Sequence, residues 1–439
     1  MLQQGLQLSL AETASVYEFL DLMSTSFTET VSQICLAAVA YNYVGYPLLL
    51  FIMSVLFQAK ADFVYLNRRV NRRCLPSSKY VPRVALLISA YNEALVIEAK
   101  VQNCVEIEYP SERLDFWFGL DAPTDSTAEL LKRVPTSHMH VLTFPRRRGK
   151  LAVLCDLARR TQADILVLTD ANTMLDRNCI RNMVRHFSDP QVGAVSGEEV
   201  RTVVEGTDPG AESIYWRYES AIKILESRLN CSQGGNGAAL AVRSSLFRPR
   251  SQSIVEDFQI PLEIRFKGFR VVYDPEAIAT EEIPTTFTAQ FVRRVRIGAG
   301  NYQTLLRNPR YLNPMNGLLT FTFISHRVLR WLGPLFLLTA FFCSIAMAVH
   351  SKFGAVLALQ CVFYSTALIG YASKKRGRSA GWFAAPLNFC CMNLALLMGL
   401  YTYLTGRQGA TWSATPRASQ PAQHDGSMDG EGQKTATAA

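Results

Sequence analysis

The hydrophobic residues of this 439-residue chain fall into two patterns. Long apolar stretches without a charged residue occupy 34–57, 331–349, 353–373 and 381–406. Each is long enough to cross a bilayer, which takes about 20 residues of helix. Core helices of soluble domains are seldom so long, and three of the stretches are nearly contiguous. The pattern therefore predicts an integral membrane protein whose polar part lies between the first and second spans.

In the polar part, short apolar runs alternate with segments of helical periodicity. Such alternation is typical of an α/β domain, in which a mostly parallel sheet carries helices on both faces. We expect strands at 84–90, 115–120, 140–144, 165–168 and 192–196, and helices at 94–104, 127–133, 151–160, 212–229 and 255–268.

The same patterns divide the chain into six parts. The segment 318–330 mixes apolar residues with His326, Arg327 and Arg330, which suits a helix lying in the membrane interface. We expect an extracytoplasmic segment at 1–30, a transmembrane helix at 31–59, a cytoplasmic α/β domain at 60–315, an amphipathic interface helix at 316–330, three transmembrane helices at 331–406 and a disordered tail at 407–439.

The basic residues predict the orientation of the spans. No Lys or Arg precedes Lys60, whereas clusters follow the first span and separate the third from the fourth. By the positive-inside rule the N-terminus lies outside and the segment 60–325 lies in the cytoplasm, so we expect a multi-pass protein of the cell inner (plasma) membrane. The clusters are Lys60, Arg68, Arg69, Arg72 and Arg73, and Lys374, Lys375, Arg376 and Arg378.

The net charge of +9 and the ten cysteines narrow the class of protein further. The juxtamembrane clusters and an anionic substrate account for the positive charge, and we do not expect a nucleic-acid partner for a membrane protein. The cysteines show no paired CxxC spacing, so we interpret them as reduced, packed thiols rather than disulfides or zinc ligands.

The strongest candidate for chemistry follows the apolar run 165–168. Asp170 and Asn172 stand there one residue apart, and ligands of open α/β sheets bind beyond the carboxyl ends of such strands. Their hard oxygens suit Mg²⁺ or Mn²⁺ bridging phosphates. The alternative is an ordinary turn, because Asp and Asn are common turn residues.

Five motifs occur in an order that resembles a known family. They are Ser89-Ala90-Tyr91-Asn92-Glu93, Asp121 within Asp-Ala-Pro-Thr-Asp, Thr169-Asp170-Ala171-Asn172, Glu256-Asp257 and a later Arg-rich stretch. Together they look like a membrane-embedded family 2 glycosyltransferase, of the group that contains cellulose, hyaluronan and poly-N-acetylglucosamine synthases. The likeness covers about 80–405. It implies a GT-A fold for the domain at 60–315, a nucleotide-sugar donor, a Mg²⁺ or Mn²⁺ cofactor and inversion at the anomeric carbon.

The resemblance also assigns roles to single residues. It implies that Asp257 is the general base that takes the proton of the acceptor hydroxyl, and that Asp170, with Asn172, holds the metal. Asn172 stands where many members have a second Asp. The residues that we expect on the donor and nucleotide side are Ala90, Tyr91, Glu93, Asp121, Lys150 and Asp170, and those on the acceptor and diphosphate side are Gly235, Asn236, Gly237, Glu256, Gln290, Arg293, Arg294 and Arg296.

The chemistry of sugar transfer asks for these residue types independently of the family. A departing nucleoside diphosphate gains negative charge, which Lys150 and the arginines can stabilise. A sugar hydroxyl attacks poorly until a carboxylate removes its proton, and Asp257 near a helix N-terminus should stay ionised at neutral pH. Plainer alternatives are a helix N-cap for Asp257, turns for Asp121 and the glycine loop 234–237, and a solvated loop for 146–148. The aromatic stripe of 215–218, with Trp216, reads as core.

One departure from the family leaves the acceptor open. Ile297 stands where the polymerising synthases have a Trp that stacks on the acceptor sugar. The first hypothesis is a polysaccharide synthase that extends a β-linked chain at the membrane, with export subunits as further partners. The second is transfer of one sugar to a lipid or lipid-linked acceptor. The third, suggested by Asn172, is an inactive membrane scaffold. A transporter is disfavoured because no span carries a charge at mid-depth.

Overall fold

The computed structural model describes residues 26–68, 79–134, 138–202, 210–248, 254–282, 287–348 and 351–407. Its centre is one eight-stranded sheet with the order β3-β2-β1-β4-β7-β6-β8-β5. The expectations for an extracytoplasmic segment at 1–30, for a tail at 407–439 and for the basic residues Arg69, Arg72 and Arg73 fall wholly or mostly outside the described residues.

The first half of the sheet is parallel. Strands β3 (Met139–Phe144), β2 (Leu114–Asp121), β1 (Val84–Ala90) and β4 (Ile165–Asp170) lie side by side in one direction. Their carboxyl ends therefore meet at one edge of the sheet. This half confirms the expected alternation of strands and helices.

The second half is mixed, with antiparallel pairs beside a parallel one. Strand β7 (Leu240–Arg243) runs antiparallel to both β4 and β6 (Val192–Thr202). Strand β8 (Arg270–Glu282) is parallel to β6. The short strand β5 (Thr173–Leu175) pairs antiparallel with β8. Strand β6 also continues to Thr202, beyond the expected end at 196.

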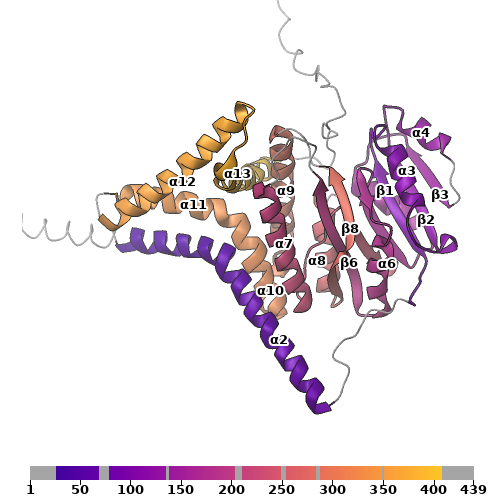
Figure 1. Cartoon of the computed structure of the whole chain (residues 1–439), viewed down its shortest axis with the longest axis horizontal. Coiled ribbons are helices and arrows are strands. Elements are labelled where there is room, and N and C mark those ends of the chain that lie inside the picture. Colours follow the sequence, from indigo (N-terminus) through magenta and orange to yellow (C-terminus); the bar gives the residue numbers. More distant parts are fainter. Residues whose placement is uncertain are drawn as a thin grey trace, which may run out of the picture.

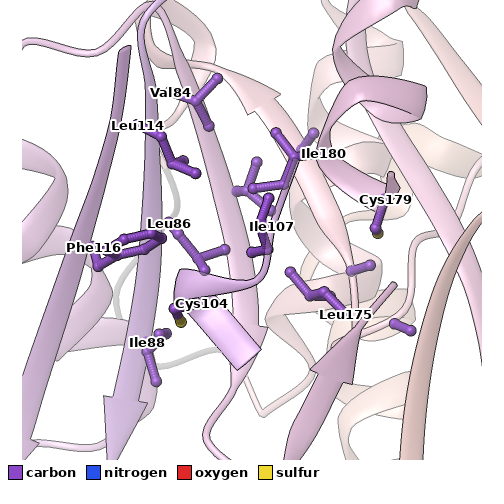
Figure 2. Close-up of a cluster of buried hydrophobic side chains, with 14 of the residues drawn as sticks. Val84, Leu86, Ile88, Cys104, Ile107, Leu114, Phe116, Leu175, Cys179 and Ile180 are labelled. Atoms are coloured by element: carbon purple, nitrogen blue, oxygen red, sulfur yellow. The ribbon is translucent and has the colours of Figure 1, made fainter. Parts of the chain in front are cut away.

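Helices cover both faces because the strands are apolar on both. Val84, Leu86 and Ile88 of β1 enter one core, whereas Ala85 and Leu87 enter the other, as the two-residue period of a strand requires. The first core lies under α3 (Ile97–Val105), α4 (Thr127–Arg133) and α6 (Cys179–Val184), and Figure 2 shows part of it. The second lies under α5 (Lys150–Arg160) and α8 (Glu256–Phe266).

The remaining long helices gather at the other end of the molecule (Figure 1). Among the described residues, four helical segments are long and apolar enough to cross a membrane: Ser26–Val64, Leu318–Ala346, Gly354–Lys375 and Gly381–Leu404. They overlap with α2 (Tyr46–Arg68), α10 (Leu318–Thr322), α11 (Leu329–Ala346), α12 (Ser351–Lys375) and α13 (Ala384–Leu404). Two further helices, α7 (Gly210–Arg228) and α9 (Phe287–Arg307), pack between them and the sheet.

The interface helix expected at 316–330 is not a separate element. Residues Leu318–Ala346 form one continuous helical segment, because a π-helical stretch at Phe323–Val328 joins α10 to α11. Two polar side chains of the segment Leu318–Ala346, His326 and Arg330, are buried rather than turned to a surface. The polar residues that suggested an interface helix therefore serve an internal contact, and a place in the membrane interface stays a prediction.

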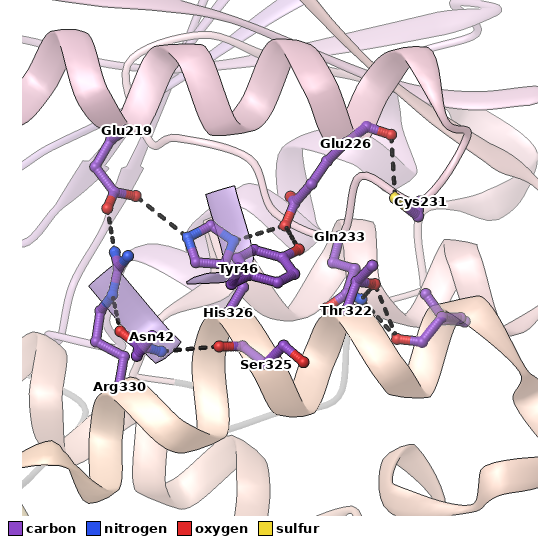
Figure 3. A network of polar contacts seen from close by, with 11 residues as sticks. Asn42, Tyr46, Glu219, Glu226, Cys231, Gln233, Thr322, Ser325, His326 and Arg330 are labelled. Carbon is purple, nitrogen blue, oxygen red and sulfur yellow. Dashed lines mark hydrogen bonds and ion pairs between the residues drawn. The ribbon is translucent and has the colours of Figure 1, made fainter. Parts of the chain in front are cut away.

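That contact joins the long helices to the sheet domain through α7 (Figure 3). Arg330 forms an ion pair with Glu219, and His326 Nδ1 lies 2.7 Å from Glu226 Oε1. The hydroxyl of Tyr46 donates a 2.7 Å hydrogen bond to the same Glu226 oxygen. These charged groups are buried, so removing one partner would leave the other as an uncompensated charge and destabilise the fold. The segment Ser26–Val64, α7 and the segment Leu318–Ala346 are thus held together.

Candidate active site

A cavity of about 420 Å³ lies at the carboxyl ends of the parallel strands. It receives Asp121 from β2, Asp170 from β4 and Asp257 from the start of α8. Helices α7, α9, α11 and α13 supply further walls, so the cavity extends from the sheet toward the apolar helices. Of the residues expected at the site, Ala90 alone does not line it; it is buried in the core at the end of β1. The others that line it are Tyr91, Glu93, Lys150, Asn172, Gly235, Asn236, Gly237, Glu256, Gln290, Arg293, Arg294 and Arg296.

Three charged groups converge on Gly237. A Cβ atom at this glycine would lie 3.5 Å from Lys150 Nζ, 3.6 Å from Asp170 Oδ2 and 3.6 Å from Asp257 Oδ2. The neighbouring Gly235 lies so close to α8 that its Cβ would come 2.9 Å from the carbonyl oxygen of Asp257. The glycine loop therefore does more than turn the chain: it leaves room where two carboxylates and an ammonium group meet.

Lys150 stands between two acids. Its Nζ lies 2.7 Å from Asp170 Oδ1 and 2.7 Å from Glu256 Oε1. Burial works to lower the pKa of Lys150, but the two carboxylates outweigh it and raise the pKa above its usual value. Lys150 is therefore a fixed positive charge in the cavity wall, at the first residue of α5.

Asp257 is the second residue of α8 and not its N-cap, which is Val255. Its Oδ1 accepts a 3.0 Å hydrogen bond from the backbone N–H of Phe258, and its Oδ2 faces Gly237. Burial and the charge of Glu256 raise the pKa of Asp257 to about 6, against the lowering effect of Lys150. The carboxyl group is therefore mostly ionised at neutral pH and takes up a proton in mildly acidic solution.

Asp121 is buried and holds the loop before α5. Its Oδ1 accepts a 2.7 Å hydrogen bond from the N–H of Arg148, and its Oδ2 accepts one of 2.9 Å from the N–H of Gly149. Gly149 has a φ of +86°, a backbone conformation that favours glycine. The loop 146–148 is thus not merely solvated, since Arg147 also lies with its guanidinium carbon 3.6 Å from the centre of the Tyr91 ring.

Asn236 and Arg294 line the cavity but also bond to the protein. Asn236 Nδ2 donates to the carbonyl of Gly197 at 2.7 Å, and its Oδ1 accepts from the N–H of Ala239 at 2.9 Å. Arg294 donates a 2.8 Å hydrogen bond to Asn388 Oδ1 of α13. These contacts shape the glycine loop and attach α9 to α13.

The donor set for a metal is uneven. Asp170 offers Oδ2 beside the Gly237 gap, whereas Asn172 donates through Nδ2 to Glu281 Oε1 at 3.2 Å. No group of three His, Cys, Asp or Glu residues arranged for a metal occurs among the described residues. The arrangement fits Mg²⁺ or Mn²⁺ of the kind that proteins bind through one or two carboxylates plus substrate phosphates.

Several cavity residues were not expected from the sequence. Trp216 was interpreted as core, which is wrong in part, because it lines the cavity with the guanidinium carbon of Arg201 3.9 Å from its ring centre. Glu199 and Arg201 form a 2.7 Å ion pair on β6, beyond the expected end of that strand. Two charged residues two apart share one face of a strand, and this was the signal available in the sequence.

Part of the cavity wall on the side of the long helices is apolar. Ile297 of α9 lies in its wall with 36% of its surface exposed, together with Met392 and Leu396 of α13 and Trp331 of α11. The position that carries a stacking Trp in the polymerising synthases thus faces the same space as Asp257.

The model of the family described as "Glycosyltransferase like family 2" matches residues 82–300. This chain belongs to that family. The matched stretch contains the whole sheet and the cavity residues Asp121, Lys150, Asp170 and Asp257.

Two curated relatives differ in what their names say they make. A poly-beta-1,6-N-acetyl-D-glucosamine synthase of Staphylococcus aureus is 24% identical over 279 residues, which cover 58% of this chain and 64% of that protein. A beta-monoglucosyldiacylglycerol synthase of Synechocystis is 25% identical over 266 residues, covering 58% of this chain and 55% of that protein. The chain thus spans less than two thirds of the length of either relative.

The fold of the chain is GT-A-like. A mannosyltransferase from Pyrobaculum calidifontis, solved in complex with GDP-Man and Mn²⁺, is similar over 86% of this chain and the whole of that chain. The TM-score is 0.65 at 21% sequence identity, so the likeness concerns the fold. The similarity extends beyond the sheet domain, because it covers more of the chain than the residues matched by the family model.

Proposed function

We propose that the protein moves a sugar from a nucleoside-diphosphate donor to an acceptor hydroxyl at a membrane, with inversion and with Asp257 as the general base. The observation that carries this proposal is the convergence of Asp170, Asp257 and Lys150 on the gap at Gly237, inside one cavity. An acid that can bind a metal, a base and a fixed cation are what the transfer of a sugar from a diphosphate requires.

The residues that line the cavity have different proposed roles. Tyr91, Glu93 and Asp121 lie where the nucleoside of the donor would bind, and Asp170 would hold Mg²⁺ or Mn²⁺. The metal, when bound, would neutralise charge on the diphosphate. Lys150 and Arg293 add positive charge from the protein, in a buried setting where such charge is little screened.

The reaction needs one proton transfer. Asp257 takes the proton of the acceptor hydroxyl as its oxygen bonds to the anomeric carbon, and the bond from that carbon to the diphosphate oxygen breaks. The nucleoside diphosphate leaves with the electron pair of the broken bond. A pKa near 6 suits this role, because the carboxylate is ionised at neutral pH yet still basic enough to accept a proton.

A growing β-linked polysaccharide is the first acceptor that we propose. The relative named as a poly-beta-1,6-N-acetyl-D-glucosamine synthase supports it, as do four membrane-length helices, more than an anchor requires. A UDP-sugar is the expected donor, and subunits for export of the chain are expected partners. The hypothesis of an inactive membrane scaffold gains no support from Asp257, because its carboxylate lies beside Lys150 and Asp170 at the Gly237 gap.

A lipid or lipid-linked acceptor is the second candidate, and a specific observation favours it. Ile297, Met392 and Leu396 make the wall that faces the apolar helices, and the ring expected at 297 is missing. The relative named as a glucosyldiacylglycerol synthase is as similar to this chain as the polysaccharide synthase is.

We also propose the membrane arrangement that the basic clusters predict. The four helices would cross the inner membrane, with the domain at 60–315 in the cytoplasm and the N-terminus outside. This arrangement would place the catalytic domain on the cytoplasmic side, together with its nucleotide-sugar donor. It would also place Lys374 and Lys375, at the end of α12, in the cytoplasm, as the positive-inside rule expects.

Purified full-length protein tests the proposal with a panel of labelled donors. UDP-N-acetylglucosamine, UDP-glucose and GDP-mannose are offered with Mn²⁺ in liposomes, with and without diacylglycerol or a polyprenyl phosphate, and the products are sized. Long products without added acceptor support the polysaccharide version. Single-sugar products that require added lipid support the second version. No transfer from any donor contradicts the proposed function.

A further inference from the structure

The pairing of strands in the sheet brings Glu281 to the loop that carries Asp170 and Asn172. Strand β5, which begins directly after Asn172, pairs antiparallel with the end of β8, and the register places Thr173 opposite Glu281. The side chain of Glu281 has 9% of its surface exposed and lies in the cavity wall. A carboxylate 109 residues away in the chain thus lies beside the Asp170–Asn172 turn.

The carboxylate of Glu281 holds a cation in a two-pronged contact. Arg293 Nη1 donates to Oε1 at 3.1 Å and Nη2 donates to Oε2 at 2.9 Å. Such a fork fixes the plane and direction of a guanidinium group, which a single contact does not. Arg293 is the seventh residue of α9, lines the cavity and has 25% of its side-chain surface exposed.

Asn172 completes the arrangement from the other side. Its Nδ2 donates to Glu281 Oε1 at 3.2 Å, the oxygen that also accepts from Arg293 Nη1. An Asp at this position would place a second carboxylate against Glu281, where an acceptor would face an acceptor. An amide is therefore the side chain that suits this neighbour.

We propose that Glu281 is a positioning residue that aims the guanidinium group of Arg293 at the donor diphosphate, with Asn172 fixing Glu281 in turn. This inference rests on the proposed function. Glu281 does not touch the diphosphate itself, since its negative charge would be repelled. Its effect is on alignment, so it acts on the transition state more than on nucleotide affinity.

The test uses the full-length protein and two readouts, kcat with the three donors above and the affinity for UDP and GDP in Mn²⁺. Glu281→Gln keeps the size of the side chain and removes its charge. We expect kcat to fall about tenfold or more because Arg293 is no longer aligned. We expect nucleotide affinity to stay or rise, because the charge of Arg293 is no longer neutralised by Glu281.

Glu276→Gln is the matched control. Glu276 lies on the same strand and also binds an arginine, with Oε2 2.6 Å from Arg185 Nη2, but it is 66% exposed and does not line the cavity. Its kcat should match that of the wild type. A Glu281→Gln protein that behaves like Glu276→Gln, or that loses nucleotide affinity as much as kcat, would overturn the positioning role.

A double-mutant cycle gives the decisive comparison. Arg293→Lys keeps the charge and loses the fork, and if Glu281 acts through Arg293 the double variant is no slower than Arg293→Lys alone. Losses that multiply would contradict the proposal. Asn172→Asp should lower kcat, although many family members carry Asp there, and a raised kcat would also contradict it. If the Glu281→Gln protein does not fold, Asn172→Ala takes its place in the double-mutant cycle with Arg293→Lys.

Asp257→Asn separates failure of this inference from failure of the proposed function. If Asp257→Asn keeps wild-type turnover, the proposed function is wrong. If Asp257→Asn is inactive while Glu281→Gln turns over like the wild type, only the role of Glu281 is wrong.

Discussion

The backbone N–H of Gly149 donates a 2.9 Å hydrogen bond to Oδ2 of Asp121, across 28 residues of chain. With the bond from Arg148 to Oδ1, it ties the end of β2 to the first turn of α5, where Lys150 begins the helix. The residue expected to hold the nucleoside therefore also holds the loop that places Lys150 and Arg147.

Asp121→Ala should accordingly weaken nucleotide binding by more than the loss of one contact. A hydrogen bond to a charged group stabilises the folded arrangement by about 1.5–3 kcal/mol. Without these bonds the loop that carries Arg147 and Lys150 is no longer held in place, so we expect the affinity for UDP to fall at least about tenfold. Titration calorimetry measures it. Asp115→Asn, on the same strand but 41% exposed, is the control and should bind like the wild type. Unchanged affinity in Asp121→Ala would contradict this role.

The rate of sugar transfer should depend on the ionisation of Asp257. Burial and Glu256 raise the pKa of this carboxyl group to about 6, and only the ionised form can accept a proton. The rate should therefore rise with pH through about 6 and be roughly tenfold lower at pH 5 than at pH 7.5. A profile of kcat/KM from pH 5 to 8 checks this, and a flat profile through pH 6 would show that another group sets the rate.

The contact between α9 and α13 should be sensitive to one methyl group. A Cβ at Gly399 would lie 2.7 Å from the backbone N of Ala299 and 2.8 Å from the carbonyl carbon of Gly298. Backbone atoms cannot move aside as a side chain can, so Gly399→Ala should cost about 1–3 kcal/mol and displace the arginines of α9. Melting temperature and kcat should both fall. Leu394→Ala, at a half-exposed position of α13, should leave kcat unchanged.

The buried pair of Arg330 and Glu219 should be important for stability. Arg330→Ala leaves Glu219 without its main counter-charge in a site with 5% exposure, which typically costs about 3–5 kcal/mol. We expect a clear drop in the melting temperature of the protein in detergent. Arg217→Ala, at an exposed position on α7, serves as the comparison. Equal melting temperatures for the two variants would mean that the network of Figure 3 adds little stability.

Much of the sheet and part of the site could be predicted from the sequence. Asp121 and Asp170 each end an apolar strand, and the carboxyl ends of parallel strands meet at one edge, so local pattern placed them together. Asp257 and the arginines came from the resemblance to the family, and the cavity brings them to the same place.

The positions of the remaining site residues depend on long-range contacts, which the local sequence pattern does not predict. Glu281 reaches Asn172 only through the pairing of β5 with β8, and Glu199 lies on a strand whose second half has few apolar residues. Trp216 and Arg330 look like a core aromatic and an interface cation until α7 and α11 are packed together. Long-range register and helix packing therefore limited the prediction.

The central claim, that Asp257 is the base of a sugar transfer in this cavity, is tested most directly by Asp257→Asn. The amide keeps the shape of the side chain and cannot accept the proton, so kcat should fall about 10²-fold or more while UDP affinity stays within about threefold of the wild type. Transfer at the wild-type rate by a folded Asp257→Asn protein would contradict the account.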